Sequence, residues 1–179
     1  MNAQTYLEEH WIKNKIWTHL SFSIHKERFK SCVSYLEGKT FIDIGCGLGH
    51  STDIMKTLSP GDWSGLEFWE GATEAAKMLF PDIKFYHSES FDLLPVCGKF
   101  DSVVCSEVIE HVGYDQDLVN GLLAITKKVL VVTTPSVEVN DPGHLRVYTV
   151  KTLRKLFEGF DFKIVKSPVF FYVIVRTGG

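Results

Sequence analysis

The chain has 179 residues, of which 45% are hydrophobic and 23% charged, and its formal net charge is −3. These values fit one folded domain over residues 1–179 and exclude a disordered chain or a strongly basic nucleic-acid binder. Charged residues such as Glu8, Glu9 and Lys13 argue against a signal peptide, and every apolar run is too short to span a membrane. The four cysteines include no C-x-x-C pair, which is typical of reduced thiols. We expect a cytoplasmic protein with no membrane partner.

The hydrophobic pattern divides the chain into helices and strands. Near the N-terminus, Leu7 and Trp11 lie at helical spacing, and so do Phe29, Val33 and Leu36. From residue 40 onward, short runs rich in β-branched residues alternate with helical patterns. In chain order, the predicted elements are helices 4–20 and 22–37, strand 40–45, helix 48–58, strand 62–67, helix 70–79, strands 83–87 and 100–106, helix 115–127, strand 128–134, helix 149–158, and strands 161–167 and 169–176.

This order of elements predicts an α/β fold. Seven strands that alternate with helices form a mostly parallel sheet with helices on both faces. The last two strands are joined through Ser167 and Pro168 with no helix between them, which predicts a hairpin and therefore one antiparallel strand. Residues 1–37 would form a helical N-terminal extension, a candidate lid, on a core of residues 38–179.

The segment FIDIGCGLG, residues 41–49, is the most informative part of the sequence. An apolar strand carries Asp43 near its end, and glycines follow at positions 45, 47 and 49 before a helix. Glycines permit a tight turn and let a ligand touch the backbone, and the start of a helix offers unpaired N–H groups. A dinucleotide-binding turn would have its third glycine at position 50, which is His50 here. Asp43 would also repel a pyrophosphate, so the turn indicates a ligand that carries a positive charge.

This strand, acid and glycine pattern resembles motif I of the class I S-adenosylmethionine-dependent methyltransferases, which have a Rossmann-like fold. Three later positions extend the resemblance. Glu67 ends the second strand, where the family places an acid that accepts hydrogen bonds from the ribose hydroxyls. Ser88-Glu89-Ser90 keeps an acid after the third strand, although Gly-Asp-Ala is more usual there. Residues 99–112, KFDSVVCSEVIEHV, resemble the family's fourth strand and the loop after it.

The resemblance implies an enzyme that uses S-adenosyl-L-methionine as its methyl donor. A sulfonium already activates the methyl group, so the protein would mainly position and desolvate the reactants. Phe68 and residues around Phe91 are candidates to sandwich the adenine. The residues implied to bind the cofactor are Asp43, Gly45, Cys46, Gly47, Gly49, Glu67, Phe68, Ser88, Glu89, Ser90 and Ser106.

The acceptor side depends on Glu107, Glu110 and His111, within the segment EVIEH, and on the later His144. If the segment is helical, its three polar residues share one face. Two carboxylates and two imidazoles form a credible divalent-metal set, and the pattern resembles the metal site of the small-RNA 3′-terminal 2′-O-methyltransferases. The same pattern resembles small-molecule methyltransferases of the ubiquinone-biosynthesis type, in which His111 could serve as a catalytic base. A structural or substrate-contact role is the third interpretation.

Three functions are therefore open. The first is a methyltransferase acting on a small molecule, at oxygen. The second is a metal-dependent RNA 3′-terminal 2′-O-methyltransferase, against which stand the net negative charge and the short spacing between residues 133–140 and His144. The third is a noncatalytic cofactor-binding module, which the intact glycine turn and acidic residues disfavour.

Overall fold

The computed structural model describes residues 23–178, so the predicted helix 4–20 lies outside the described part of the chain. From β1 onward, strands and helices alternate as the hydrophobic pattern predicts. In chain order, the elements are α2 (Ser23–Val33), β1 (Thr40–Ile44), α3 (His50–Leu58), β2 (Asp62–Glu67), α4 (Glu70–Leu79), β3 (Lys84–His87), α5 (Leu94–Cys97), β4 (Phe100–Ser106), α6 (Asp115–Ile125), β5 (Thr126–Pro135), α7 (Val150–Leu156), β6 (Asp161–Lys166) and β7 (Phe170–Arg176).

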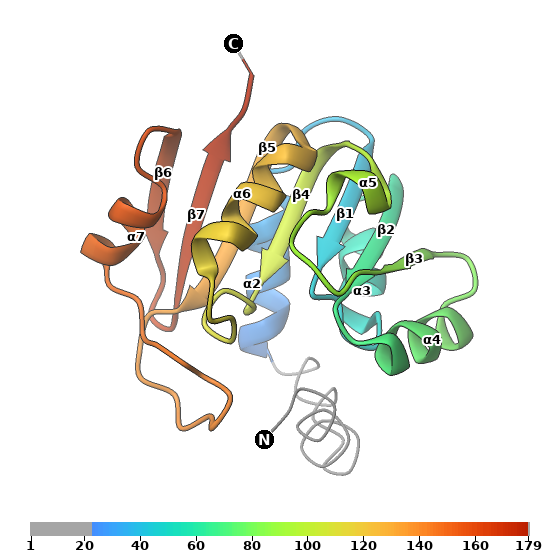
Figure 1. Cartoon of the computed structure of the whole chain (residues 1–179), viewed down its shortest axis with the longest axis horizontal. Helices are drawn as coiled ribbons and strands as arrows, with labels where there is room; N and C mark the ends of the chain where they lie inside the picture. The colour runs from blue at the N-terminus through green and yellow to red at the C-terminus, as the bar shows by residue number, and fades with distance from the viewer. Residues whose placement is uncertain (1–22, 179) are drawn as a thin grey trace.

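The strands form one seven-stranded sheet with the order β3-β2-β1-β4-β5-β7-β6 (Figure 1). Neighbouring strands from β3 to β5 are parallel, whereas β7 runs antiparallel to both β5 and β6. The predicted α/β fold with one antiparallel strand is confirmed. The strand order reverses between β1 and β4, and ligands bind outside the carboxyl ends of the strands at such a point in open α/β sheets.

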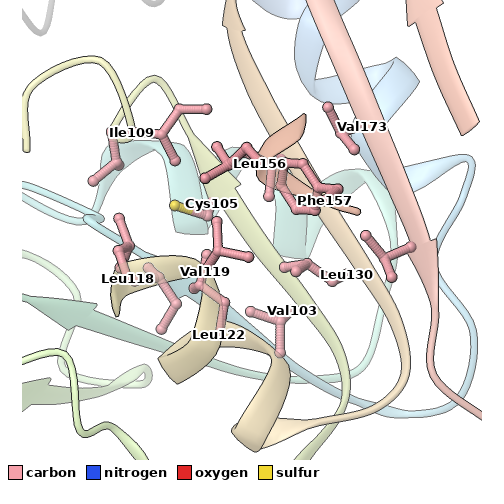
Figure 2. Packing of buried hydrophobic residues seen from close by; sticks show 14 of the residues in the cluster. Val103, Cys105, Ile109, Leu118, Val119, Leu122, Leu130, Leu156, Phe157 and Val173 are labelled. Atoms are coloured by element: carbon pink, nitrogen blue, oxygen red, sulfur yellow. The ribbon is translucent and has the colours of Figure 1, made fainter. Parts of the chain in front are cut away.

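One face of the sheet is covered by α6 and α7 (Figure 2). Val103 and Cys105 of β4 lie two residues apart and therefore point to the same face, where Leu118 and Leu122 of α6 pack on them. Phe157, at the end of α7, joins the same cluster. All five side chains are fully buried, so this layer removes a large apolar surface from water.

The opposite face is covered by α2 and α3. Phe29 of α2 and Met55 of α3 are fully buried against Val104 and Val131, which alternate along the strands with the residues of the first face. Strands buried on both faces read as continuous apolar runs, which is the pattern the sequence shows. In Figure 1, α6 lies in front of the sheet and α2 behind it. Among residues 23–178, no helix is both long and apolar enough to cross a bilayer.

Two predicted helices end earlier than expected. Helix 22–37 stops at Val33, because the hydroxyl of Ser102 on β4 bonds both the amide and the carbonyl of Glu37 and directs the chain towards β1. Helix 115–127 stops at Ile125, and β5 begins at the next residue with no loop between the two elements.

The loops around β4 also differ from the prediction. The four-residue helix α5 precedes β4 in a stretch where no element was predicted. After β4, the segment 107–111 is not helical. Glu107 has a φ of 60°, and the chain turns at Ile109–His111. The shared helical face expected for Glu107, Glu110 and His111 is therefore absent, although the turn brings two of the three together in another way.

Candidate active site

Polar groups gather at the carboxyl ends of the three central strands. Asp43 is the fourth residue of β1, Glu67 ends β2, and Ser106 ends β4 immediately before Glu107. Because β1 lies between β2 and β4, the turn that follows it lies between Glu67, at the end of β2, and Glu107, just after β4. This turn lies at the point where the strand order reverses.

The turn after β1 depends on glycine. Gly45, Gly47 and Gly49 have φ angles of 75°, 55° and 85°, a region that L residues with a side chain rarely adopt. The amides of Gly45 and Cys46 donate to the Leu66 carbonyl at 2.7 and 3.1 Å, which fixes the turn to β2. A Cβ atom at position 47 would meet no atom within 4 Å. The backbone there faces open space, as a ligand-binding turn requires.

Glu67 holds this turn through its side chain. Its Oε2 atom accepts a hydrogen bond from the Gly47 amide at 2.7 Å, and its Oε1 atom accepts from the amides of Phe68 and Trp69 at 2.7 and 3.2 Å. Burial raises the pKa of the Glu67 carboxyl, and the three amide donors oppose that rise. The acid expected at the end of the second strand is therefore fixed in place beside the glycine turn.

Asp43 links β1 to the first turn of α3. Its Oδ2 atom accepts hydrogen bonds from the hydroxyls of Ser51 and Thr52 at 2.7 and 2.8 Å. The side chain is buried, and burial raises the pKa of Asp43 to about 6 despite these two donors. A positive group close to this buried carboxyl would lower its pKa and stabilise the ionised form, which fits the charge inferred for the ligand of the turn.

The loop after β3 carries the predicted adenine-side residues. The Ser88 hydroxyl donates to the Ser90 carbonyl at 2.7 Å and closes a tight turn. Glu89 between them is exposed and lines a groove between this loop and α6. The rings of Phe68 and Phe91 contact each other edge to face, with centroids 5.3 Å apart and planes at 88°. The two rings therefore lie together beside this loop, and their role in a sandwich around adenine stays a prediction.

Three of the four predicted metal ligands come together at the other side of the site. Donor atoms of Glu110, His111 and His144 all lie within 4.8 Å of one another. The two imidazoles contact edge to face, with centroids 4.6 Å apart. Glu110 is 1% exposed, and neither of its carboxylate oxygens has a hydrogen-bond partner. Buried polar groups are rarely left in this state, so the orphaned carboxylate indicates that a further group belongs here.

The charge states in this cluster follow from burial. Burial raises the pKa of Glu110 well above its ordinary value, and the nearby Glu107 carboxylate raises it further. The Thr134 hydroxyl, itself without a hydrogen bond, lies close enough to moderate that rise. Burial and the neighbouring His144 lower the pKa of His111. His111 is therefore a neutral imidazole near neutral pH, able to accept a proton or to bind a metal.

Glu107, the fourth predicted ligand, is turned away from this cluster. Its Oε1 atom accepts from the Thr133 hydroxyl at 2.9 Å, and that hydroxyl is 2.9 Å from the hydroxyl of Ser106. Its Oε2 atom lies 3.5 Å from a guanidinium nitrogen of Arg28. Within residues 23–178, Glu107 is the only non-glycine residue with a positive φ. Such a conformation persists only where surrounding contacts enforce it, and these contacts do so here.

Arg28 is a site residue that the sequence analysis missed. This residue of α2 is 5% exposed, and its guanidinium lies over the rings of Phe29 and Phe170 at 5.0 and 4.9 Å. Its Nε atom is buried without a hydrogen-bond partner. Its charge opposes the burial that raises the pKa values of Asp43 and Glu107. The only hint in the sequence is an arginine beside Phe29, on the apolar stripe of the predicted helix.

Comparison with protein families gives one match that covers most of the chain. A family model described as a methyltransferase domain matches residues 27–167, more than half of the sequence. Among curated proteins, none matches the chain.

Several solved structures share the fold. An S-adenosylmethionine-dependent methyltransferase from Archaeoglobus fulgidus has a TM-score of 0.72 at 17% identity, over 91% of this chain and 99% of that one. Magnesium protoporphyrin IX methyltransferase from Synechocystis PCC 6803, with bound S-adenosylhomocysteine (SAH), gives 0.65 at 16% identity, over 85% and 83%. The methyltransferase domain of a bacterial CtHen1 gives 0.70 at 18% identity, over 87% and 100%. At 16–18% identity, these structures show that the fold is shared and nothing finer.

Proposed function

Because the chain belongs to the methyltransferase-domain family and is an S-adenosylmethionine-dependent methyltransferase, we propose that it methylates a hydroxyl oxygen of a small molecule. One structural neighbour is named for a small-molecule substrate, magnesium protoporphyrin IX, which supports an acceptor of this kind. The observation that carries the choice of oxygen is the neutral, half-buried His111 at the carboxyl edge of the sheet, beside His144.

The residues at the glycine turn fit the cofactor. When bound, S-adenosyl-L-methionine supplies a methyl group that its sulfonium activates for displacement. Glu67 would hold the ribose hydroxyls, and the open backbone at Gly47 leaves room for the ligand. Asp43 fixes the start of α3 against β1, and its carboxylate would favour the positively charged end of the ligand. Backbone of the same turn and side chains of the adjoining loops complete the proposed set, namely Gly45, Cys46, Gly49, Phe68, Ser88, Glu89, Ser90 and Ser106.

Arg28 would bind the carboxylate of the cofactor's amino-acid end. Asp43, Glu67 and Glu107 surround the turn with negative charge, so a ligand carboxylate needs a cation there. Arg28 is the buried cation that the described residues place beside Glu107, and its unpartnered Nε offers a free donor. Arginine also suits a carboxylate, because its planar donors match the two oxygens.

His111 would act as the base on the acceptor side. Its pKa is below the ordinary value, so the neutral ring can accept the hydroxyl proton while the oxygen attacks the methyl group. The ring nitrogen would take up the proton that the hydroxyl loses, and the cofactor held by Glu67 and the glycine turn would supply the activated methyl group. His144 would orient the ring through the edge-to-face contact.

A divalent metal at Glu110, His111 and His144 is the second candidate, and the orphaned Glu110 carboxylate favours it. Two imidazoles and a carboxylate form a ligand set that zinc and similar ions accept, with positions left open for a substrate. Such an ion would lower the pKa of a bound hydroxyl and would serve equally the terminal ribose of an RNA. An RNA 3′-terminal 2′-O-methyltransferase is therefore the alternative acceptor class.

The test uses a cofactor with a trideuterated methyl group. The protein is incubated with panels of phenols, aliphatic alcohols, amines and short RNAs, and mass spectrometry locates the labelled methyl. We expect the label on the oxygen of a small hydroxylated molecule. In His111→Ala, turnover should be lost while SAH binds with unchanged affinity by calorimetry. Label on nitrogen or carbon, or on the RNA 3′ end alone, would contradict the proposal.

A further inference from the structure

The loop between β5 and α7, residues 136–149, is long and mostly exposed. At its start, the Ser136 amide donates to the Val169 carbonyl at 2.9 Å. In its middle, the Gly143 and His144 amides both donate to Asp141. Long loops of this kind in compact domains are commonly functional.

Its later part, residues 143–148, is tied to the turn that carries Glu110 and His111. A hydrogen bond links the Gly143 backbone to the His111 side chain. The Leu145 amide donates to the Glu110 carbonyl at 2.8 Å. Arg146 donates to the Gly113 carbonyl at 3.0 Å and pairs with Asp115, the first residue of α6.

Tyr148 completes this attachment from inside the protein. It is 5% exposed, and its hydroxyl lies 2.7 Å from Asp115 Oδ2 and 3.2 Å from the Ile109 carbonyl. Burial and the Asp115 carboxylate raise the pKa of Tyr148, so the hydroxyl stays a donor. Although burial opposes it, the bonds from Tyr148 and Arg146 hold the pKa of Asp115 below its ordinary value. We call Tyr148, Asp115 and Arg146 the clasp.

The clasp explains the position of His144. Along residues 144–148, the exposed side chains of Leu145 and Val147 alternate with the more buried His144, Arg146 and Tyr148. This alternation is that of an extended segment, so fixing Arg146 and Tyr148 inward also turns His144 inward. His144 is thereby held against His111, and the hydrogen bond between the Gly143 backbone and the His111 side chain is a second attachment beside it.

We propose that Tyr148 and Asp115 are positioning residues for the acceptor step, because they hold His144 against Glu110 and His111 without contacting either reactant. This inference rests on the proposed function of that cluster. The effect of the clasp can be separated from cofactor binding. The bonds of the clasp all end on residues 109–115, whereas most of the proposed cofactor residues lie on the turns after β1, β2 and β3.

The test compares Tyr148→Phe and Asp115→Asn with Tyr35→Phe, a matched control that also loses one tyrosine hydroxyl. Tyr35 lies in the connection between α2 and β1, where Lys163 stacks on its ring. We expect Tyr148→Phe to lower kcat by roughly ten- to a hundredfold, the range that misplacement of a catalytic group costs. KM should change less, SAH affinity should stay within about twofold, and the control should match the wild type. The double variant should lose no more than the worse single variant, because both changes open the same clasp.

A second readout needs no acceptor. Nuclear Overhauser contacts between the ring protons of His111 and His144 should be present in the wild type and in Tyr35→Phe, and weakened in both clasp variants. If these contacts and kcat persist in folded clasp variants, the positioning role is wrong. It is also wrong if kcat falls only in parallel with SAH affinity and melting temperature. If the wild type methylates no hydroxyl, the proposed function fails, while the ring contacts still decide whether the clasp sets His144. If Tyr148→Phe does not fold, Asp115→Asn carries both measurements.

Discussion

The Gly47 amide and the Glu67 carboxylate are joined by a hydrogen bond of 2.7 Å, so the acid at the end of β2 holds the turn that follows β1. The glycine turn and the acid at the end of β2, which most indicate a cofactor site, are therefore held together. A change in either residue should alter binding through both the lost contact and the displaced backbone.

The first prediction concerns the open space at Gly47. In Gly47→Val, a β-branched side chain would fill that space and oppose a φ of 55°, so SAH binding should fall below detection by calorimetry. Gly98→Val is the matched control, because Gly98 also has a positive φ and open space, but follows α5. Gly47→Val should lose stability on the order of 1–2 kcal/mol from backbone strain. Gly98→Val should lose at least as much, because Gly98 has a ψ of −151°, in a region almost confined to glycine. Equal SAH affinity in both would remove the turn from the binding site.

The second prediction concerns the charge on Glu67. Glu67→Gln should weaken SAH binding by about 1.5–3 kcal/mol, the range for hydrogen bonds to a charged group. Glu70→Gln, an exposed acid three residues later at the start of α4, should leave the affinity unchanged. Isothermal calorimetry at one ionic strength measures both variants. If adenosine itself binds both variants alike, Glu67 is not the ribose anchor.

The third prediction concerns Arg28. Arg28→Gln should weaken SAH binding by about tenfold or more, but should leave unchanged the affinity for methylthioadenosine, which lacks the amino-acid end. Arg176→Gln is the control, because Arg176 pairs with Glu37 on the surface. Equal losses for both ligands would show that Arg28 acts through the fold of the site and not through a ligand carboxylate.

The fourth prediction concerns Asp43 and pH. Its folded pKa of about 6 lies above the ordinary value of 3.8, so the folded state binds the proton more tightly than the unfolded state. This contribution to stability is complete below pH 4 and is lost as the pH rises through 6, with a total on the order of 3 kcal/mol. In Asp43→Asn, urea unfolding between pH 4 and 7 should show a shallower fall in the free energy of unfolding. An identical slope in the two proteins would mean that Asp43 does not titrate in this window.

The fifth prediction separates the base from the metal. If His111 acts as a base, exhaustive chelation should leave turnover intact, and Glu110→Gln should be mild. If a metal is bound, chelation, Glu110→Gln and His144→Ala should each abolish turnover, because each removes the ion or a ligand. Native mass spectrometry of the purified protein, before and after chelation, reports the ion directly. Turnover that survives chelation but is absent in His111→Ala would reject the metal.

Much of the fold could be predicted because its cause is local. Val103 and Val104 belong to a strand buried on both faces, so their run of apolar residues already indicates a parallel sheet. The glycine turn and Glu67 were likewise predictable, since the carboxyl ends of parallel strands lie at one edge. Arg28 was not predictable in its role, because its partners Glu107 and Phe170 are distant in sequence.

The residues on the side of the methyl acceptor were also only partly predictable from the sequence. A local pattern suggested a helical face over Glu107, Glu110 and His111, but tertiary contacts decide the geometry. The bond from Thr133 holds Glu107 in a left-handed conformation, and the chain then turns. His144 reaches this turn only through a loop whose end is fixed by Tyr148, which no spacing rule reveals. The residue types were informative, whereas their grouping required the structure.

The antiparallel strand β7 has a consequence for how the protein matures in the cell. Because β7 runs against its neighbours, its first residue, Phe170, lies at the carboxyl edge of the sheet, where Arg28 stacks on it. β7 is also the only strand that pairs with β6 in the described sheet. A ribosome makes β7 after the other six strands of the described sheet. Until residues 170–176 emerge, a nascent chain therefore has neither the Phe170 ring that Arg28 stacks on nor a partner for β6. A chain terminated before them would expose the apolar edge of β5, a mark by which chaperones and proteases can recognise unfinished product.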